Sequence, residues 1–154
     1  MTTYYVDTSA LVKRYIDEVG SGWVRVKLGG SLPSSVIVVH LVIVEMTSAL
    51  ARRKREGILT PGEYERVKAA FRSDCLNGYR IVTVVDGVID EATRLLEHYP
   101  LRAYDAVHLA AALVANRHLL ADGLTPLIFL SADDRLNDAA SAEGLAVDNP
   151  NQHP

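Results

Sequence analysis

Short runs of β-branched and aromatic residues recur along the chain, each followed by a polar residue and a helical pattern. The clearest runs cover 4–6, 79–85 and 127–130, and weaker runs cover 36–39 and 145–147. Parallel strands separated by ten or more helical residues are joined by crossover connections. The pattern therefore predicts an α/β fold in which helices cover both faces of a parallel sheet.

Capping signals mark several of the helices between these runs. Thr8 or Ser9 can cap a first helix, and Thr60 with Glu63 forms a capping box that has Pro61 at the first helical position. Polar residues and glycines mark the other ends. The predicted helices cover about 8–15, 21–28, 40–56, 61–76, 105–118 and 134–143.

Composition adds a size class and a compartment. The chain has 154 residues, of which 49% are hydrophobic and 23% are charged, and this suits one compact domain. We expect a single domain over 1–148 and a flexible tail over 149–154. The single Cys75 excludes an internal disulfide, and the apolar stretch 36–46 is well short of the ~20 residues of a membrane span. We expect a soluble, cytoplasmic protein with no membrane contact.

Acidic residues stand at four places where the pattern calls for apolar ones. Asp7 ends the first strand, Glu45 interrupts an apolar helical stretch, Asp105 opens an alanine-rich helix, and Asp133 with Asp134 follows the strand at 127–130. An unpaired buried carboxylate costs several kcal/mol, so this placement needs a compensating partner. The carboxyl ends of parallel strands collect at one edge of a sheet, where a hard cation such as Mg²⁺ or Mn²⁺ would serve several carboxylates at once.

Each acid also has a simpler interpretation. Asp7 and Asp133 can cap helices, and Asp105 can be a first-turn acid that the helix dipole favours. Glu45 has no Lys or Arg within one helical turn, so it needs a partner elsewhere, such as Arg102 or the imidazole of His108. His108 on its own is more typical of a packing residue than of a catalytic base.

Four segments resemble the acidic motifs of PIN domains, and among them the VapC-type toxins of toxin–antitoxin modules. The resemblance spans nearly the whole chain, with the motifs in order and at ordinary spacing. The segments are YVDTSALVK at 5–13, VEM at 44–46, RAYDAVHLA at 102–110 and FLSADDRL at 129–136.

The resemblance implies a three-layer α/β/α sandwich with a five-stranded parallel sheet and an endoribonuclease that depends on Mg²⁺ or Mn²⁺. It also implies a homodimer that is inhibited by a cognate VapB-type antitoxin. Carried over by position, Asp7, Glu45 and Asp105 match three of the metal-binding, catalytic acids. The fourth matches Asp133 through its spacing from a preceding serine, although a slip of one residue would exchange it for Asp134.

Hydroxyls and cations complete the implied site. Thr8, Ser9 and Ser131 match positions where a hydroxyl orients a carboxylate, although helix capping explains them equally well. An RNA substrate also needs cations at the rim of the cleft. The candidate RNA-binding residues are Lys13, Arg14, Arg52 and Arg53, with Tyr104 or Trp23 as possible stacking surfaces for bases.

Three alternatives stay open from the sequence. A PIN-type nuclease could process RNA outside any toxin module. A phosphoryl-transfer domain could use Asp7 as its nucleophile, but the common phosphatase version places a second acid where this chain has Ser9. A non-catalytic domain could use the acids only to cap helices and hold a structural ion.

Overall fold

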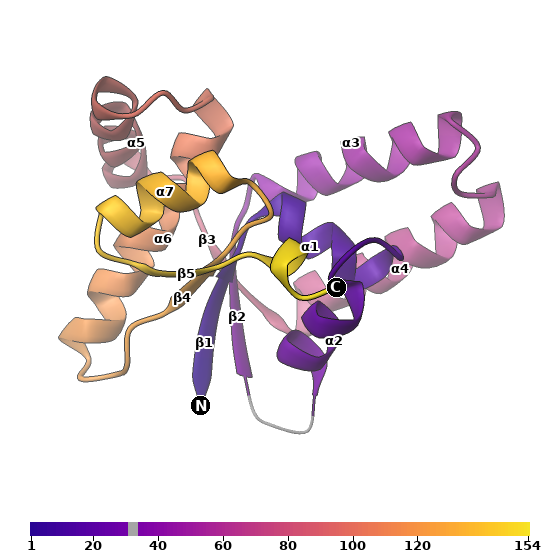
Figure 1. The fold of residues 1–154 in the computed structure, drawn as a ribbon, viewed down its shortest axis with the longest axis horizontal. Coiled ribbons are helices and arrows are strands. Elements are labelled where there is room, and N and C mark those ends of the chain that lie inside the picture. The colour runs from indigo at the N-terminus through magenta and orange to yellow at the C-terminus, as the bar shows by residue number, and fades with distance from the viewer. Residues whose placement is uncertain (31–33) are drawn as a thin grey trace.

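The computed structural model describes residues 1–30 and 34–154 and has a five-stranded parallel sheet at its centre (Figure 1). The strand order is β3-β2-β1-β4-β5, and every neighbouring pair is parallel. The predicted α/β fold with a five-stranded parallel sheet is confirmed. The strands are β1 (Thr2–Val6), β2 (Ser34–Val39), β3 (Tyr79–Val82), β4 (Ile128–Leu130) and β5 (Ala146–Asp148).

Helices cover both faces of this sheet, as the pattern predicted. Within the described residues they are α1 (Thr8–Tyr15), α2 (Ser21–Gly29), α3 (Val42–Arg55), α4 (Pro61–Asn77), α5 (Asp86–His98), α6 (Ala103–Ala121) and α7 (Asp134–Ala142). One face packs against α1 to α4 and the other against α5 to α7, and α3 and α4 extend together away from the sheet (Figure 1). The Thr60–Glu63 capping box of α4 forms as expected. Among the helices of residues 1–30 and 34–154, none is long and apolar enough to cross a membrane.

Alternate side chains of β1 pack into two hydrophobic cores, one on each face of the sheet. Tyr4 and Val6 pack among the residues of α1 to α4, whereas Tyr5 packs with Phe129 of β4 and with α6. Successive side chains of a strand point to opposite faces, so a central strand must be apolar throughout. Asp7 breaks this run one residue past the end of β1, where the chain turns into α1.

The order of the strands reverses next to β1. The connections from β1 to β2 and from β2 to β3 use α1 to α4, whereas those from β3 to β4 and from β4 to β5 use α5 to α7. The crossovers that follow β1 and β4 thus leave on opposite faces, which opens a crevice at the carboxyl ends of these strands. Asp7 and Asp133 follow these two strand ends.

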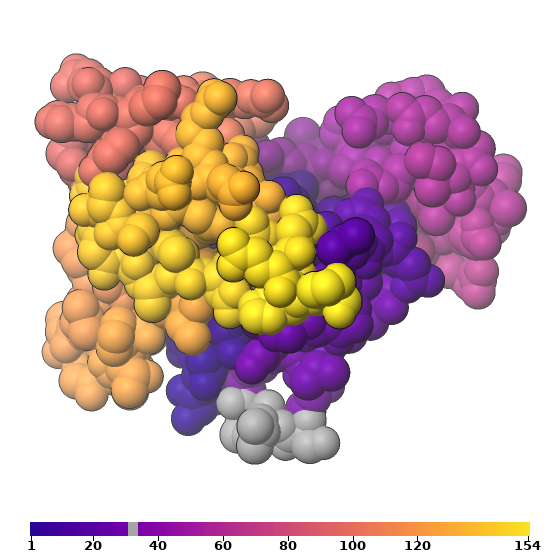
Figure 2. Space-filling view, in the orientation of Figure 1, coloured from indigo at the N-terminus to yellow at the C-terminus, as the bar shows by residue number. Residues whose placement is uncertain are grey.

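Two segments differ from the sequence-based prediction. The run 79–85 was expected to be one strand, but β3 ends at Val82 and residues 86–98 form α5, which the sequence analysis did not identify. Residues 149–154 were expected to be a flexible tail. Instead, a short 3₁₀ helix at Pro150–Gln152 packs against α2 (Figure 2). The ring of His153 stacks there on Trp23, with ring centroids 4.2 Å apart.

Candidate active site

A cleft of about 600 Å³ opens at the carboxyl ends of β1 and β4. Asp7, Glu45, Asp105 and Asp133 all line it, although they come from four separate stretches of the chain. They stand at the start of α1, on α3, in the first turn of α6 and at the start of α7. The fold therefore gathers into one cleft the acids that the sequence analysis selected.

Asp7 is the most buried of these carboxylates, with an exposed fraction of 4%. It is the N-cap of α1, a role that the sequence suggested for Asp7 as well as for Thr8 or Ser9, and its Oδ1 accepts from the backbone N–H of Ala10 at 3.2 Å. Ser9 Oγ donates to Oδ1 at 2.8 Å, and Ser131 Oγ donates to Oδ2 at 3.1 Å. Burial raises the pKa of Asp7, and the charge of His108 and these hydrogen bonds only partly oppose it.

The two serines also connect the loops that follow β1 and β4. Ser9 Oγ accepts from the backbone N–H of Ala132 at 2.9 Å, and Ser131 Oγ accepts from the backbone N–H of Asp133 at 3.1 Å. Both hydroxyls can thus orient Asp7 while they fix the loop that presents Asp133. Thr8 lines the cleft as well, with its Oγ1 3.4 Å from Nε2 of His108.

The structure separates the two candidates for the fourth acid. Asp133 lines the cleft, and its Oδ1 caps α7 by accepting from the backbone N–H groups of Arg135 at 2.9 Å and Leu136 at 3.3 Å. Asp134 lies outside the cleft lining and accepts from Asn149 Nδ2 at 2.8 Å. The geometry thus places Asp133 with the other acids, although its capping bonds show that the simpler role also holds.

Glu45 is bound by a histidine. Nε2 of His108 lies 2.5 Å from Oε1 of Glu45, and Nδ1 of His108 lies 3.0 Å from the hydroxyl of Tyr5. His108 has an exposed fraction of only 1%. Burial alone would lower the pKa of His108, but the hydrogen bond to Glu45 and the nearby carboxylates, Asp7 foremost, outweigh it and raise the pKa. Of the two partners that the sequence suggested for Glu45, the structure has His108.

Asp105 is half-buried in the first turn of α6, where the helix dipole favours a negative charge. Its pKa is nevertheless raised, first by burial and then by the negative charge of Asp133. Arg102 and His108 oppose this shift without cancelling it. The acids thus lie close enough for their charges to interact.

This donor set fits a hard divalent cation. The cleft offers carboxylate oxygens without thiolates, the chemistry that Mg²⁺ and Mn²⁺ select. Burial raises the pKa of both Asp7 and Asp105, and a bound cation would favour their ionised forms. Over residues 1–30 and 34–154, however, no three acidic, histidine or cysteine side chains already stand in the arrangement of a metal site. The hydrogen bond of Glu45 to His108 and the capping bonds of Asp133 hold these two carboxylates in place instead.

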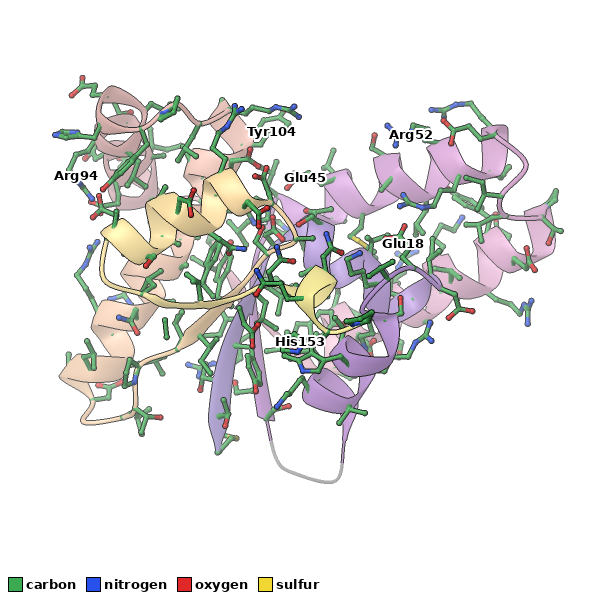
Figure 3. All side chains as sticks on the ribbon, viewed as in Figure 1. Glu18, Glu45, Arg52, Arg94, Tyr104 and His153 are labelled. Carbon is green, nitrogen blue, oxygen red and sulfur yellow. The ribbon has the colours of Figure 1, made fainter. Side chains whose placement is uncertain are left out.

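Cations and one aromatic ring form the rim of the cleft. Arg52, Arg102 and Tyr104 line it, and Tyr104 is mostly exposed at the start of α6 (Figure 3). Arg52 lies seven residues beyond Glu45, two turns along the same face of α3. Sequence reasoning did not select Arg102 as a rim cation, although its position three residues before Asp105 was a usable signal.

All four predicted cations have structural partners, and the pair of Arg52 with Glu56, at 3.6 Å, is the most exposed of them. Arg53 lines the cleft but pairs with Glu18, and Lys13, only 5% exposed, pairs with the same carboxylate at 3.4 Å. Arg14 donates to the backbone carbonyl of Leu28 at 2.7 Å. Lys13 and Arg14 are not among the residues that line the cleft, nor is Trp23.

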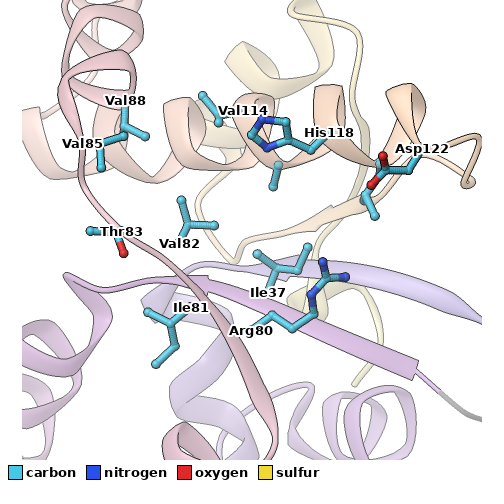
Figure 4. A pocket seen from close by; sticks show the side chains of 12 residues that line it. Ile37, Arg80, Ile81, Val82, Thr83, Val85, Val88, Val114, His118 and Asp122 are labelled. Carbon is cyan, nitrogen blue, oxygen red and sulfur yellow. The ribbon is translucent and has the colours of Figure 1, made fainter.

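A second cavity, of about 350 Å³, has a different character (Figure 4). It lies beside β3, and its lining is mainly apolar, with Val82, Val88 and Val114 among the side chains. Asp122 is the one carboxylate among its described lining residues. The acidic cluster therefore distinguishes the cleft beside Asp7.

Comparison with known proteins gives a consistent result. The model of the PIN domain family matches residues 4–141. Ribonuclease VapC46 of Mycobacterium tuberculosis is 34% identical over 148 residues, which cover 96% of this chain and 97% of the relative. Ribonuclease VapC45 of the same species is 31% identical over 147 residues, which cover 96% of this chain and 95% of the relative.

Solved structures share the fold at lower identity. VapC20 of Mycobacterium tuberculosis, described as a toxin that cleaves the sarcin-ricin loop, has a TM-score of 0.61 at 20% identity and covers 93% of this chain and 96% of its own. VapBC2 of Rickettsia felis, solved with a DNA fragment from its promoter, has a TM-score of 0.64 at 10% identity, with coverages of 96% and 98%. This chain belongs to the PIN domain family and is related to the VapC ribonucleases.

Proposed function

We propose that this protein is a metal-dependent endoribonuclease that acts as the toxin of a VapBC-type toxin–antitoxin module. The observation that carries the proposal is the cleft that unites Asp7, Glu45, Asp105 and Asp133. The ribonuclease names of relatives at 31–34% identity over nearly the full chain support the reaction class. Such an activity on cellular RNA would place the protein in the cytoplasm.

In this proposal the four carboxylates hold Mg²⁺ or Mn²⁺, which, when bound, supplies an activated water and neutralises charge on the scissile phosphate. The protein contributes the geometry. Ser9 and Ser131 fix both oxygens of Asp7, so this buried carboxylate has one orientation relative to the cleft. No side chain has to act as a nucleophile.

Substrate binding uses the rim. Arg52 and Arg102 line the same cleft as the acids and provide positive charge for phosphates, and the exposed ring of Tyr104 offers a surface on which an unpaired base can stack. This combination favours single-stranded or loop RNA, whose bases are free to leave the helix. Two of the predicted cations, Lys13 and Arg14, have no part in it.

We further propose a homodimer and a cognate VapB-type antitoxin as partners. Several structural neighbours are toxin–antitoxin complexes, including one from Klebsiella pneumoniae with a TM-score of 0.61 at 14% identity, which covers 96% of this chain and 97% of its own. These complexes support the proposal that a protein with this fold binds an antitoxin. Growth arrest on expression, relieved by the product of a short reading frame just upstream, would favour the toxin role over RNA processing outside a module.

The deciding experiment compares Asp105, which lines the cleft, with Asp134, which lies outside its lining. Wild type should cleave a mixed single-stranded RNA in Mg²⁺ or Mn²⁺ and lose this activity in chelator. Asp105→Asn should reduce cleavage by about 100-fold or more, because the substitution removes one carboxylate from the metal site. Asp134→Asn is the matched control, since Asp134 lies outside the cleft lining, and it should cleave like wild type.

Circular dichroism should first establish that both variants are folded. Cleavage that persists in chelator would contradict the metal mechanism. Wild-type activity in a folded Asp105→Asn variant would show that the activity belongs to another site or to a contaminant.

A further inference from the structure

A buried chain of hydrogen bonds lies beneath the acidic cleft. It runs from the hydroxyl of Tyr5 on β1 through the imidazole of His108 on α6 to the carboxylate of Glu45 on α3. The two contacts measure 3.0 Å and 2.5 Å. Both Tyr5 and His108 are almost inaccessible to solvent, whereas Glu45 reaches the cleft. These hydrogen bonds therefore join three elements at Glu45, in the first turn of α3.

Packing fixes the ring of His108. The ring of Tyr5 stacks on Phe129 with centroids 5.4 Å apart and meets the imidazole edge-on, with centroids 6.1 Å apart and planes at 81°. A buried ring that packs against the ring of Tyr5 has little freedom to rotate. The direction in which Nε2 points is thus set by the core of the protein, not by the cleft.

Hydrogen-bond chemistry fixes which atom donates to Glu45. An ionised carboxylate only accepts, so Nε2 of His108 must carry the hydrogen that lies between them. The hydroxyl of Tyr5 can donate to a bare Nδ1 or accept from a protonated one. The Nε2–H donor to Glu45 is therefore the same for the neutral and the cationic ring.

Glu45 has no other fixed partner of this kind. Within residues 1–30 and 34–154, His108 is its only salt-bridge partner, and no arginine or lysine holds it. A glutamate has several rotatable bonds and needs such a contact to keep one orientation. Asp7, by comparison, is held by two serines and a backbone N–H.

We propose that His108 is a positioning residue that holds Glu45 in its orientation at the cleft, with Tyr5 fixing the imidazole from behind. This inference rests on the proposed function, in which Glu45 is one of the metal-binding acids. Groups that orient a metal-binding side chain typically contribute about 10- to 100-fold to metal affinity or activity. His108 would act through Glu45 without touching the substrate.

The test measures Mn²⁺ affinity by electron paramagnetic resonance on RNA-free protein. His108→Leu removes the donor and should weaken Mn²⁺ binding by about tenfold or more. His108→Gln keeps an N–H donor near the position of Nε2 and should recover most of this affinity. Leu113→Ala, at another buried position of α6, is the control for general destabilisation and should bind Mn²⁺ like wild type.

A second measurement needs no variant and no metal. Nitrogen-15 NMR of the metal-free wild type should show a protonated Nε2 in His108, whether or not Nδ1 is also protonated. An unprotonated Nε2 would overturn the proposal, and so would wild-type Mn²⁺ affinity in folded His108→Leu.

Glu45→Gln distinguishes this inference from the proposed function. If Glu45→Gln weakens Mn²⁺ binding and His108→Leu does not, only the positioning role is refuted. If Glu45→Gln itself binds Mn²⁺ like wild type, Glu45 is not a ligand, and both the four-acid site and the positioning role are refuted.

Discussion

The substitution Asp7→Asn should make the metal-free protein more stable than wild type and the metal-loaded protein less stable than wild type. Asp7 is 4% exposed, and burial raises its pKa above the ordinary value of 3.8. The folded state therefore holds a proton on this carboxyl more tightly than the unfolded state does, so stability falls as the pH rises from about 4 through the folded-state pKa. At pH 7 the buried charge is a cost that asparagine does not carry.

Asparagine keeps the local structure. It is as good an N-cap as aspartate, and its side-chain oxygen can still accept from the backbone N–H of Ala10. Asp7→Asn should therefore raise Tm relative to wild type in chelator at pH 7. The difference should shrink as the pH falls below the folded-state pKa of Asp7, because the wild-type carboxyl is then protonated.

Metal should invert this order. An ion present at 100 times its Kd stabilises the folded state by about 2.7 kcal/mol. For a chain of 154 residues, each kcal/mol shifts Tm by about 2–4 °C, so wild type should gain about 5–11 °C in saturating Mg²⁺ or Mn²⁺. The asparagine variant should gain little of this, because it lacks the carboxylate at the centre of the site.

The assay is thermal unfolding followed by circular dichroism, with and without metal, at pH 7 and near pH 4. A variant that gains as much Tm from metal as wild type would refute a ligand role for Asp7. A variant that is less stable than wild type in chelator at pH 7 would refute the conclusion that its buried charge opposes folding.

Asp133→Asn should weaken Mn²⁺ binding by about tenfold or more, whereas Asp134→Asn should change the affinity by less than about twofold. Isothermal titration calorimetry can compare the two variants, and a larger loss of affinity in Asp134→Asn would identify Asp134 as the fourth metal-binding acid. Arg52→Gln should weaken binding of single-stranded RNA and lower the slope of log affinity against log salt by about one; an unchanged slope would remove Arg52 from the phosphate contacts. Tyr104→Ala should weaken RNA binding by about 1–3 kcal/mol without changing Mn²⁺ affinity. Unchanged RNA affinity would show that the ring does not stack on a base. His153→Ala should lower Tm by about 1–6 °C, because the lost stack on Trp23 contributes about 0.5–1.5 kcal/mol. An unchanged Tm would indicate that the C-terminal residues are a flexible tail, as the sequence suggested.

The fold was predictable because the local signals agree with the tertiary structure. Residues 36–39 are apolar without a break, as a strand covered on both faces requires, and the Thr60 capping box marks the start of α4. The end of β3 was not predictable in this way. Residues 81–85 are β-branched throughout, yet β3 is an edge strand that leaves the sheet after Val82 and continues into α5.

The acids of the site could be selected from the sequence because each interrupts an apolar context. Their partners were harder to identify, since these are contacts between distant positions. The sequence suggested Arg102 or His108 for Glu45 without deciding between them, and the structure has His108, 63 residues away. The pair of Arg53 with Glu18, 35 residues apart, was not suggested. A local charge pattern shows Arg53 in a basic run but does not show the acid that holds it. The stack of His153 on Trp23 escaped prediction for the same reason.

Helix α3 carries both an acid of the cleft and a cation of its rim, Glu45 and Arg52. Their separation of seven residues corresponds to about 10 Å along the helix axis. One residue inserted between them would turn Arg52 by about 100° around the axis and carry it away from the acidic face. Natural length variation in this protein's relatives should therefore spare this stretch and concentrate in the turn between α3 and α4, where an insertion leaves the spacing between acid and cation intact.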